Sequence, residues 1–327
     1  MLRASVAPHL REPRSPFYQT GGVLLCLLPL IGFSCMYYGI RPLLLVLCGL
    51  FGAVLTEMLC CVFAHRRPTL SDGTAAVTGA LIGAMMSPLT PFWVPVIGAM
   101  FAIGVAKMPF GGVGRNIFNP AAAGMAFCAI CFATRLFEYP DPSQSEALPL
   151  FDTTDVITAV SPMRQLADGG IPKVTLVALL SGDFPGPIGS AGILILLAAA
   201  LFLFVRRSSS PYILLPYLAT CAVIAALFPR SDIGAGMSVQ LELCSGLLLF
   251  CGVFLLSDPV TAPRFWLARI VYGVMAGVLV MVLRYYGRFE CCEFFAVLLV
   301  NSFSALLDRT CWSLLRRLRR WKGAVRT

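Results

Sequence analysis

Long apolar runs alternate with short polar connections along almost the whole chain. Ten runs approach or exceed the length needed to cross the roughly 30 Å hydrocarbon core of a bilayer as helices. They lie near residues 18–37, 42–64, 74–88, 91–108, 119–136, 190–206, 211–228, 239–257, 264–284 and 291–308. The pattern predicts an all-α polytopic membrane protein with about ten transmembrane helices. The long polar interruption at 137–189 predicts one large loop outside the membrane.

Composition supports a membrane protein. Charged residues make up 13% of the chain, whereas soluble domains carry about 25%. The net charge of +9 comes from basic residues between and after the apolar runs, where they set orientation, so we expect no nucleic-acid partner. With the N-terminus inside, 18 Lys and Arg residues fall on the inner side and seven on the outer. We therefore expect both termini in the cytoplasm and loop 137–189 on the outer face.

Thirteen cysteines raise the question of a metal centre or a disulfide framework. Most of them fall inside apolar runs, where free cysteine behaves as a small hydrophobe. Cys128 and Cys131 form a C-x-x-C pair, but no second pair or histidine cluster accompanies them. We expect no metal site, and the outer loop contains no cysteine for a disulfide.

Two similar Pro-rich turns suggest an internal repeat. The turn after the third run reads Ser87-Pro88-Leu89-Thr90-Pro91-Phe92-Trp93. The turn after the eighth run, Ser257 to Trp266, has the same order of Ser, Pro, Thr, Pro, Phe and Trp with a few residues inserted. If they correspond, the chain consists of two five-helix repeats of opposite orientation, as in many transporters. Chance similarity is the alternative. The repeat interpretation divides the chain into a basic N-terminus (1–17), a first repeat (18–136), the outer loop (137–189), a second repeat (190–308) and a basic tail (309–327).

Polar residues at membrane depth are few and carry the candidate chemistry. Glu57 lies in the second run among Leu55, Met58 and Leu59, so its carboxylate should face away from lipid. Ion-path candidates are the four acidic residues in or at the ends of runs, Glu57, Asp72, Glu242 and Asp258. Each also fits a helix-packing or interfacial role. The Gly-rich run from Phe110 to Pro120 fits either a backbone-lined ligand cradle or a tight re-entrant turn.

Three segments resemble, in order and spacing, those of the RnfD/NqrB family. They are Ser71-Asp72-Gly73-Thr74, the Gly-rich run ending in Asn-Ile-Phe-Asn-Pro-Ala at Ala121, and Ser257-Asp258-Pro259-Val260-Thr261-Ala262-Pro263. RnfD is the D subunit of the Rnf ion-translocating electron transport complex, and NqrB belongs to the sodium-pumping quinone reductase. The resemblance covers about residues 14–308.

The resemblance implies an FMN joined through its phosphate to a hydroxyl of an outer loop. The family pattern is roughly Asp-x-x-(Ser/Thr)-(Gly/Ser)-Ala-Thr, with the last Thr esterified. It falls here on Asp155, Thr158, Ala159, Val160 and Ser161, which makes Ser161 the expected acceptor and Thr158 the fallback. Val160 and Ser161 depart from the pattern's Ala and Thr. From the residues alone, the segment also fits a short helix with Asp155 or Thr158 as its N-cap.

The resemblance implies a translocase-class subunit of the inner membrane that is inactive alone and passes electrons through FMN. That electron flow would be coupled to Na⁺ or H⁺ movement. A second, non-covalent flavin such as riboflavin is compatible with it. Implied partners are the other Rnf subunits, including flavin and iron–sulfur subunits, a flavin transferase and membrane lipid. Two alternatives remain open: a non-redox transporter or channel of inverted-repeat fold, related to the urea-transporter architecture, and a flavin-free scaffold subunit.

Overall fold

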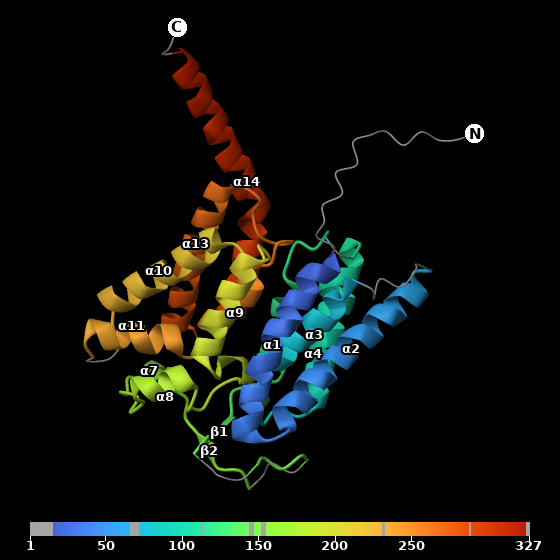
Figure 1. The fold of residues 1–327 in the computed structure, drawn as a ribbon, viewed down its shortest axis with the longest axis vertical. Coiled ribbons are helices and arrows are strands. Elements are labelled where there is room, and N and C mark those ends of the chain that lie inside the picture. Colours follow the sequence, from blue (N-terminus) through green and yellow to red (C-terminus); the bar gives the residue numbers. More distant parts are fainter. Residues whose placement is uncertain are drawn as a thin grey trace.

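The computed structural model describes residues 16–65, 72–112, 114–143, 147–151, 155–230, 233–287 and 289–324. Helices dominate it (Figure 1). The first half contains α1 (Pro16–Tyr38), α2 (Arg41–Phe63), α3 (Thr74–Ala84), α4 (Trp93–Phe101), the π-helix η2 (Ala102–Lys107), the 3₁₀ turn η3 (Met108–Phe110), α5 (Pro120–Cys131) and α6 (Ala133–Leu136).

The connecting loop contains β1 (Tyr139–Pro140), β2 (Thr158–Ala159), α7 (Pro162–Ala167), α8 (Leu176–Ser181) and the 3₁₀ turn η4 (Ile188–Ser190). The second half contains α9 (Ile193–Val205), α10 (Pro211–Leu227), α11 (Ala235–Cys244), α12 (Leu248–Phe250), the π-helix η5 (Cys251–Leu256), α13 (Trp266–Tyr286) and α14 (Glu293–Ala324).

The helices coincide with the ten predicted runs. In the described residues, five helical stretches are long and apolar enough to cross a membrane: α1, α2, α4 with its continuation to Phe110, α13 and α14. Helices α11 and α12–η5 form a pair bent by 62° that counts as one broken span. Four shorter apolar helices, α3, α5, α9 and α10, account for the remaining runs. The prediction of an all-α polytopic membrane protein is confirmed.

Several boundaries differ from the hydropathy pattern. The eighth run is two helices, because Gly246 adopts a left-handed conformation (φ 69°) between Cys244 and Leu248. The fifth predicted run, 119–136, is not one helix: α5 ends at Cys131, and the short helix α6 begins at Ala133. Helix α14 continues to Ala324, so the expected boundary at residue 308 is not a break in the helix.

The two halves lie side by side, α1–α5 in one and α9–α14 in the other (Figure 1). In each half the second helix packs against the third and the fourth: α2 on α3 and α4, and α10 on α11 and α13. The turn after α3 contacts the long loop, since Ser87 donates to the Glu138 carbonyl and the Ile188 N–H to Met86 O at 3.0 Å. The turn after η5 instead lies by the start of α3, where Asp258 and Thr74 line one cavity. The similar turns therefore lie at opposite ends, as an inverted repeat predicts.

Glycine allows α2 and α3 to touch through their backbones. A Cβ added to Gly49 would lie 2.5 Å from the Gly79 carbonyl oxygen, and one added to Gly83 would lie 2.6 Å from the Val46 Cα. Small residues of this kind permit the close helix contacts on which packing in a membrane depends.

Arg41 stabilises the end of the first half that carries the long loop. Sequence patterning places it among the outer-side charges, but its side chain is buried at the start of α2. Its guanidinium donates only to backbone carbonyls, of Pro88, Leu89, Thr90, Pro149 and Leu150, at 2.5–3.4 Å. One side chain thus joins α2, the turn after α3 and the long loop.

Candidate functional site

Ser161 is the N-cap of helix α7 and is 3% exposed. Its Oγ accepts a hydrogen bond from the Arg164 N–H at 3.1 Å and donates one to Oε1 of Glu290. Pro162 follows at the first helical position, where its missing N–H carries no penalty and its fixed φ suits a helix. The hydroxyl expected to accept the flavin phosphate is therefore held in one place by two hydrogen bonds.

The remaining residues of the expected attachment pattern flank this cap. Thr158 and Ala159 form β2, which pairs antiparallel with Pro140 and Tyr139 of β1. Thr158 and Asp155 are exposed, and Val160 is 54% exposed. The interpretation of Asp155 or Thr158 as an N-cap is wrong, because the β1–β2 pairing holds Thr158 extended and the helix begins only after Ser161.

A cavity of about 280 Å³ opens beside Ser161. Thr158, Ala159, Val160 and Ser161 line it, whereas Asp155 does not. The other lining residues are Phe137, Glu138, Tyr139, Arg164 and Glu290. A hydroxyl, a cation and two aromatic rings are the groups needed to esterify a phosphate, balance its charge and contact a flavin. The residues present thus fit a phosphate-linked flavin.

The sequence did not reveal Phe137, Glu138, Tyr139, Arg164 or Glu290 as site residues, and Glu290 is the one that contacts Ser161 from the far end of the chain. It lies between α13 and α14, and burial raises its pKa to about 7, while the Ser161 hydrogen bond and the Arg164 charge act in the opposite direction. The only sequence signal is an acidic residue in a short connection between two apolar runs. Nothing in that signal specifies a partner 129 residues away.

A buried charge network supports this end of the second half. Arg284 donates to Oε2 of Glu242 at 3.1 Å and to Oε1 of Glu293, and Arg230 pairs with Oε1 of Glu242 at 2.6 Å. Arg284 also donates to the carbonyls of Glu242 and Ser245 at 2.7 and 3.0 Å. These carbonyls end α11, so Arg284 satisfies the orphan acceptors that the break in this span creates.

The four ion-path candidates do not converge on one path. Glu57 is fully buried, as expected, and its Oε2 lies 2.8 Å from the Lys107 Nζ. Asp72 accepts from the N–H and hydroxyl of Thr74, and Thr74 accepts from Lys107 at 2.7 Å. This cluster lies at the end of the first half opposite the long loop, whereas Glu242 belongs to the network at the end of the second half near that loop.

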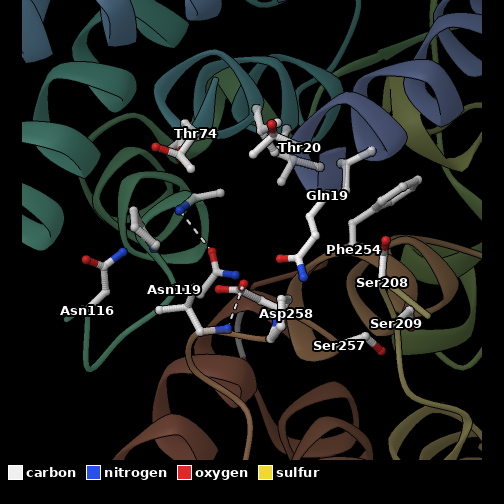
Figure 2. A pocket seen from close by; sticks show the side chains of 18 of the residues that line it. Gln19, Thr20, Thr74, Asn116, Asn119, Ser208, Ser209, Phe254, Ser257 and Asp258 are labelled. Carbon is white, nitrogen blue, oxygen red and sulfur yellow. Dashed lines mark hydrogen bonds between the residues drawn. The ribbon is translucent and has the colours of Figure 1, made fainter. Parts of the chain in front are cut away.

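Asp258, the fourth candidate, lines a cavity of about 240 Å³ at the end of the helices opposite the long loop (Figure 2). We call it the inner cavity, because the charge pattern of the sequence predicts that this end is cytoplasmic. Its carboxylate accepts from the Val260 N–H and the Thr261 hydroxyl. Among the described residues, Asn116 Oδ1 and the hydroxyls of Ser208 and Ser209 are buried here without a hydrogen-bond partner. Buried polar atoms that lack partners indicate room for a polar ligand or water.

The Gly-rich run forms one wall of this inner cavity. Gly111, Gly112 and Gly114 have positive φ angles of 105°, 88° and 80°. Asn119 ends the run by capping α5 and donates to the Leu255 carbonyl of the other half at 3.2 Å. The run is therefore a turn that joins the halves and also lines a cavity, so the structure combines features of both interpretations.

Cys128 and Cys131 lie in different surroundings. Cys128 is buried and its thiol donates to the Val94 carbonyl at 3.7 Å, whereas Cys131 is exposed. Cys128 thus has the packing role expected of a cysteine in an apolar run.

Comparisons with known proteins give a consistent match over nearly the whole chain. Residues 3–313 match the family described as NQR2, RnfD, RnfE. The D subunit of an ion-translocating oxidoreductase complex from Halorhodospira halophila is 30% identical, covering 94% of this chain and 93% of that protein. The D subunit of the Na⁺-translocating ferredoxin:NAD⁺ oxidoreductase complex of Acetobacterium woodii is also 30% identical, with the same coverage. A third D subunit, from Stutzerimonas stutzeri, is 31% identical over 88% of each chain.

Proposed function

This chain belongs to the NQR2, RnfD, RnfE family, and from that membership we propose that it is the D-type membrane subunit of an Rnf-type ion-translocating oxidoreductase complex. In this role it passes electrons within the complex while electron flow drives Na⁺ or H⁺ across the inner membrane. Its partners are the other subunits of the complex, and the long loop lies on the outer face.

We assign the attachment of FMN to Ser161. The observation that carries this assignment is the Ser161 hydroxyl at the edge of a cavity that also holds Arg164 and two aromatic residues. FMN supplies one- and two-electron redox chemistry when bound, and the protein supplies position and electrostatics. Here Ser161 fixes the phosphate. The Arg164 side chain is 54% exposed and pairs with Oδ2 of Asp168 at 3.1 Å, and it exchanges this exposed pairing for the phosphate to balance its charge. Thr158 is the fallback acceptor on the exposed strand β2.

Mass spectrometry of the 137–189 region tests the assignment. The chain is produced in its native host with its flavin transferase and digested. We expect the peptide containing Ser161 to carry the mass of FMN less one water. A peptide that is modified on Thr158, or unmodified, contradicts the assignment to Ser161.

We further propose that a second, non-covalent flavin such as riboflavin occupies the inner cavity (Figure 2). Phe254 offers an aromatic face, Asn116 an unpaired amide oxygen, and Thr20, Ser208 and Ser209 are hydroxyl-bearing residues that suit a polyol chain. Extraction under denaturing conditions should release one flavin that lacks a covalent link. Asn116→Leu should reduce that amount and leave the covalent flavin unchanged.

A flavin-free scaffold is the second candidate function, and one observation favours it. Ser161 is 3% exposed and already serves as a helix cap, so little of its surface is open to an incoming phosphate. Flavin fluorescence on a denaturing gel separates the two: the flavoprotein gives a fluorescent band, and the scaffold, or a non-redox transporter, does not.

Ion translocation through Glu57, Asp72, Glu242 and Asp258 remains a proposal. Glu57 and Glu242 are ion-paired, which supports a structural role for both. Measuring ion uptake in vesicles that contain the whole complex tests Glu57→Gln, with Asp183→Asn, at an exposed carboxylate of the long loop, as control. Uptake that is unchanged relative to electron flow removes Glu57 from the path.

A further inference from the structure

Glu290 faces the proton of the Ser161 hydroxyl. Its carboxylate accepts the O–H of Ser161, while the Arg164 N–H donates to the same oxygen. A hydroxyl has one proton and two lone pairs. One lone pair of the Ser161 Oγ therefore remains for a bond to an incoming atom, and the cavity lies beside it.

We propose that Glu290 takes the Ser161 proton when the flavin phosphate is attached, and then retains it beside the phosphoester. The inference rests on the proposed attachment at Ser161. Glu290 belongs to the chain that receives the flavin, not to the transferase. The Ser161 hydroxyl is therefore already in contact with a group that can take its proton when the transferase binds.

The bond changes define what the donor must be. The Ser161 Oγ attacks the flavin phosphorus, an Oγ–P bond forms, and the Oγ proton passes to Oε1 of Glu290. A flavin monophosphate would have to expel hydroxide, a poor leaving group. A flavin dinucleotide instead breaks its phosphoanhydride P–O bond, and the departing nucleotide monophosphate takes the electron pair. No oxidation or reduction takes place.

The surroundings of Glu290 suit this transfer. Its pKa of about 7, raised by burial, places proton uptake near neutral pH, where a general base is most effective. Once the phosphoester is present, its negative charge disfavours a carboxylate at the same place, so the proton stays on Glu290. Charged and titratable groups that face Glu290 are Arg164 of α7, Tyr139 of β1, Arg284 of α13, and Cys291 and Glu293. Asp168 and Arg230 line the neighbouring cavity.

Glu290→Gln isolates proton uptake from positioning. The amide oxygen of glutamine still accepts a hydrogen bond from Ser161 but does not take its proton at neutral pH. The full chain is made in a host that lacks flavin transferase and purified in detergent. Purified transferase and flavin adenine dinucleotide are then added, and the fraction of Ser161 peptide carrying FMN is followed by mass spectrometry between pH 5.5 and 8.5.

We expect wild-type transfer to rise about tenfold per pH unit below pH 7 and to level above it, because only ionised Glu290 takes the proton. Glu290→Gln should slow transfer about 100-fold and remove this pH dependence. Asp183→Asn, at an exposed carboxylate of the same loop that lines neither cavity beside Glu290, should behave as wild type. Melting temperatures check folding. If Glu290→Gln does not fold, Glu290→Asp should show slower transfer with the pH dependence retained.

A wild-type rate and pH profile in Glu290→Gln overturn the role of Glu290 and leave the assignment of Ser161 intact. Where Glu290→Asp decides, a wild-type rate does the same. No transfer to wild type under any condition overturns the assignment of Ser161 and this inference with it.

Discussion

Arg284→Met should strongly destabilise the second half of the protein. Arg284 is fully buried and neutralises Glu293, whose second oxygen, Oε2, is buried without a partner among the described residues. Removing one partner of a buried ion pair costs about 3–5 kcal/mol. The carbonyls of Glu242 and Ser245 lose their donor as well, at about 1–3 kcal/mol each if no water replaces it. The sum, about 5 kcal/mol or more, approaches the total stability of many proteins.

Unfolding in mixed micelles of a mild detergent and dodecyl sulfate, followed by circular dichroism, measures this cost. Arg264→Met, at an exposed arginine, should stay within about 0.5 kcal/mol of wild type. The double variant Arg284→Met/Glu293→Gln should regain most of the unfolding free energy lost by leaving Glu293 without its cation. It should not regain the free energy lost at the carbonyls of Glu242 and Ser245. If Arg284→Met unfolds within about 1 kcal/mol of wild type, or the double variant is no better than the single one, our account of the network is refuted.

Three further predictions concern the flavin and the helix contacts. Ser161→Ala should abolish attachment of FMN while Ser161→Thr retains it, measured by in-gel flavin fluorescence; equal fluorescence of Ser161→Ala would point to Thr158. Gly49→Ala should lower the free energy of unfolding by about 1–3 kcal/mol, because the added Cβ meets the backbone of α3. Gly21→Ala is the control: a Cβ there has no atom within 4 Å, so the free energy of unfolding should stay the same or rise in the same assay. Asn119→Ala should cost about 1–2 kcal/mol through loss of the α5 cap, in addition to the lost hydrogen bond to the Leu255 carbonyl; Asn119→Ser, whose hydroxyl keeps a capping acceptor, should regain the part due to the cap in the same unfolding assay, and no gain over Asn119→Ala would contradict the capping role.

Hydropathy predicted the spans because the thickness of the bilayer sets the length of an apolar run. Hydropathy could not predict the break at Gly246, since the same apolar residues suit one continuous helix or two short ones. The break is stable because Arg284 of α13 donates to the carbonyls that it leaves without helical partners. Counting positive charges also treated Lys107 and Arg284 as loop residues that set orientation. The structure buries both, because each has carboxylate partners that only the folded chain brings near.

The candidate site was predicted in part for the same reason. The expected attachment pattern is local, so the family resemblance could point to Ser161 and its neighbours, and the attachment itself stays a prediction. The N-cap role of Ser161 depends on the pairing of β2 with β1, and its contact with Glu290 depends on the connection between the last two helices. Both are long-range contacts, and neither leaves a periodic signal in the sequence.

The hydrogen bonds from Arg41 to the long loop have a consequence for sequence variation in this family. The Arg41 guanidinium donates its hydrogen bonds only to main-chain oxygens of residues 88–90 and 149–150. These bonds therefore do not depend on the side chains at those positions. These positions can drift in sequence while the loop stays docked, provided the backbone keeps its path. Arg41 itself has no such freedom, since a lysine ammonium cannot reproduce a planar donor fork spread over five acceptors. Among relatives, we expect an invariant arginine facing a variable loop.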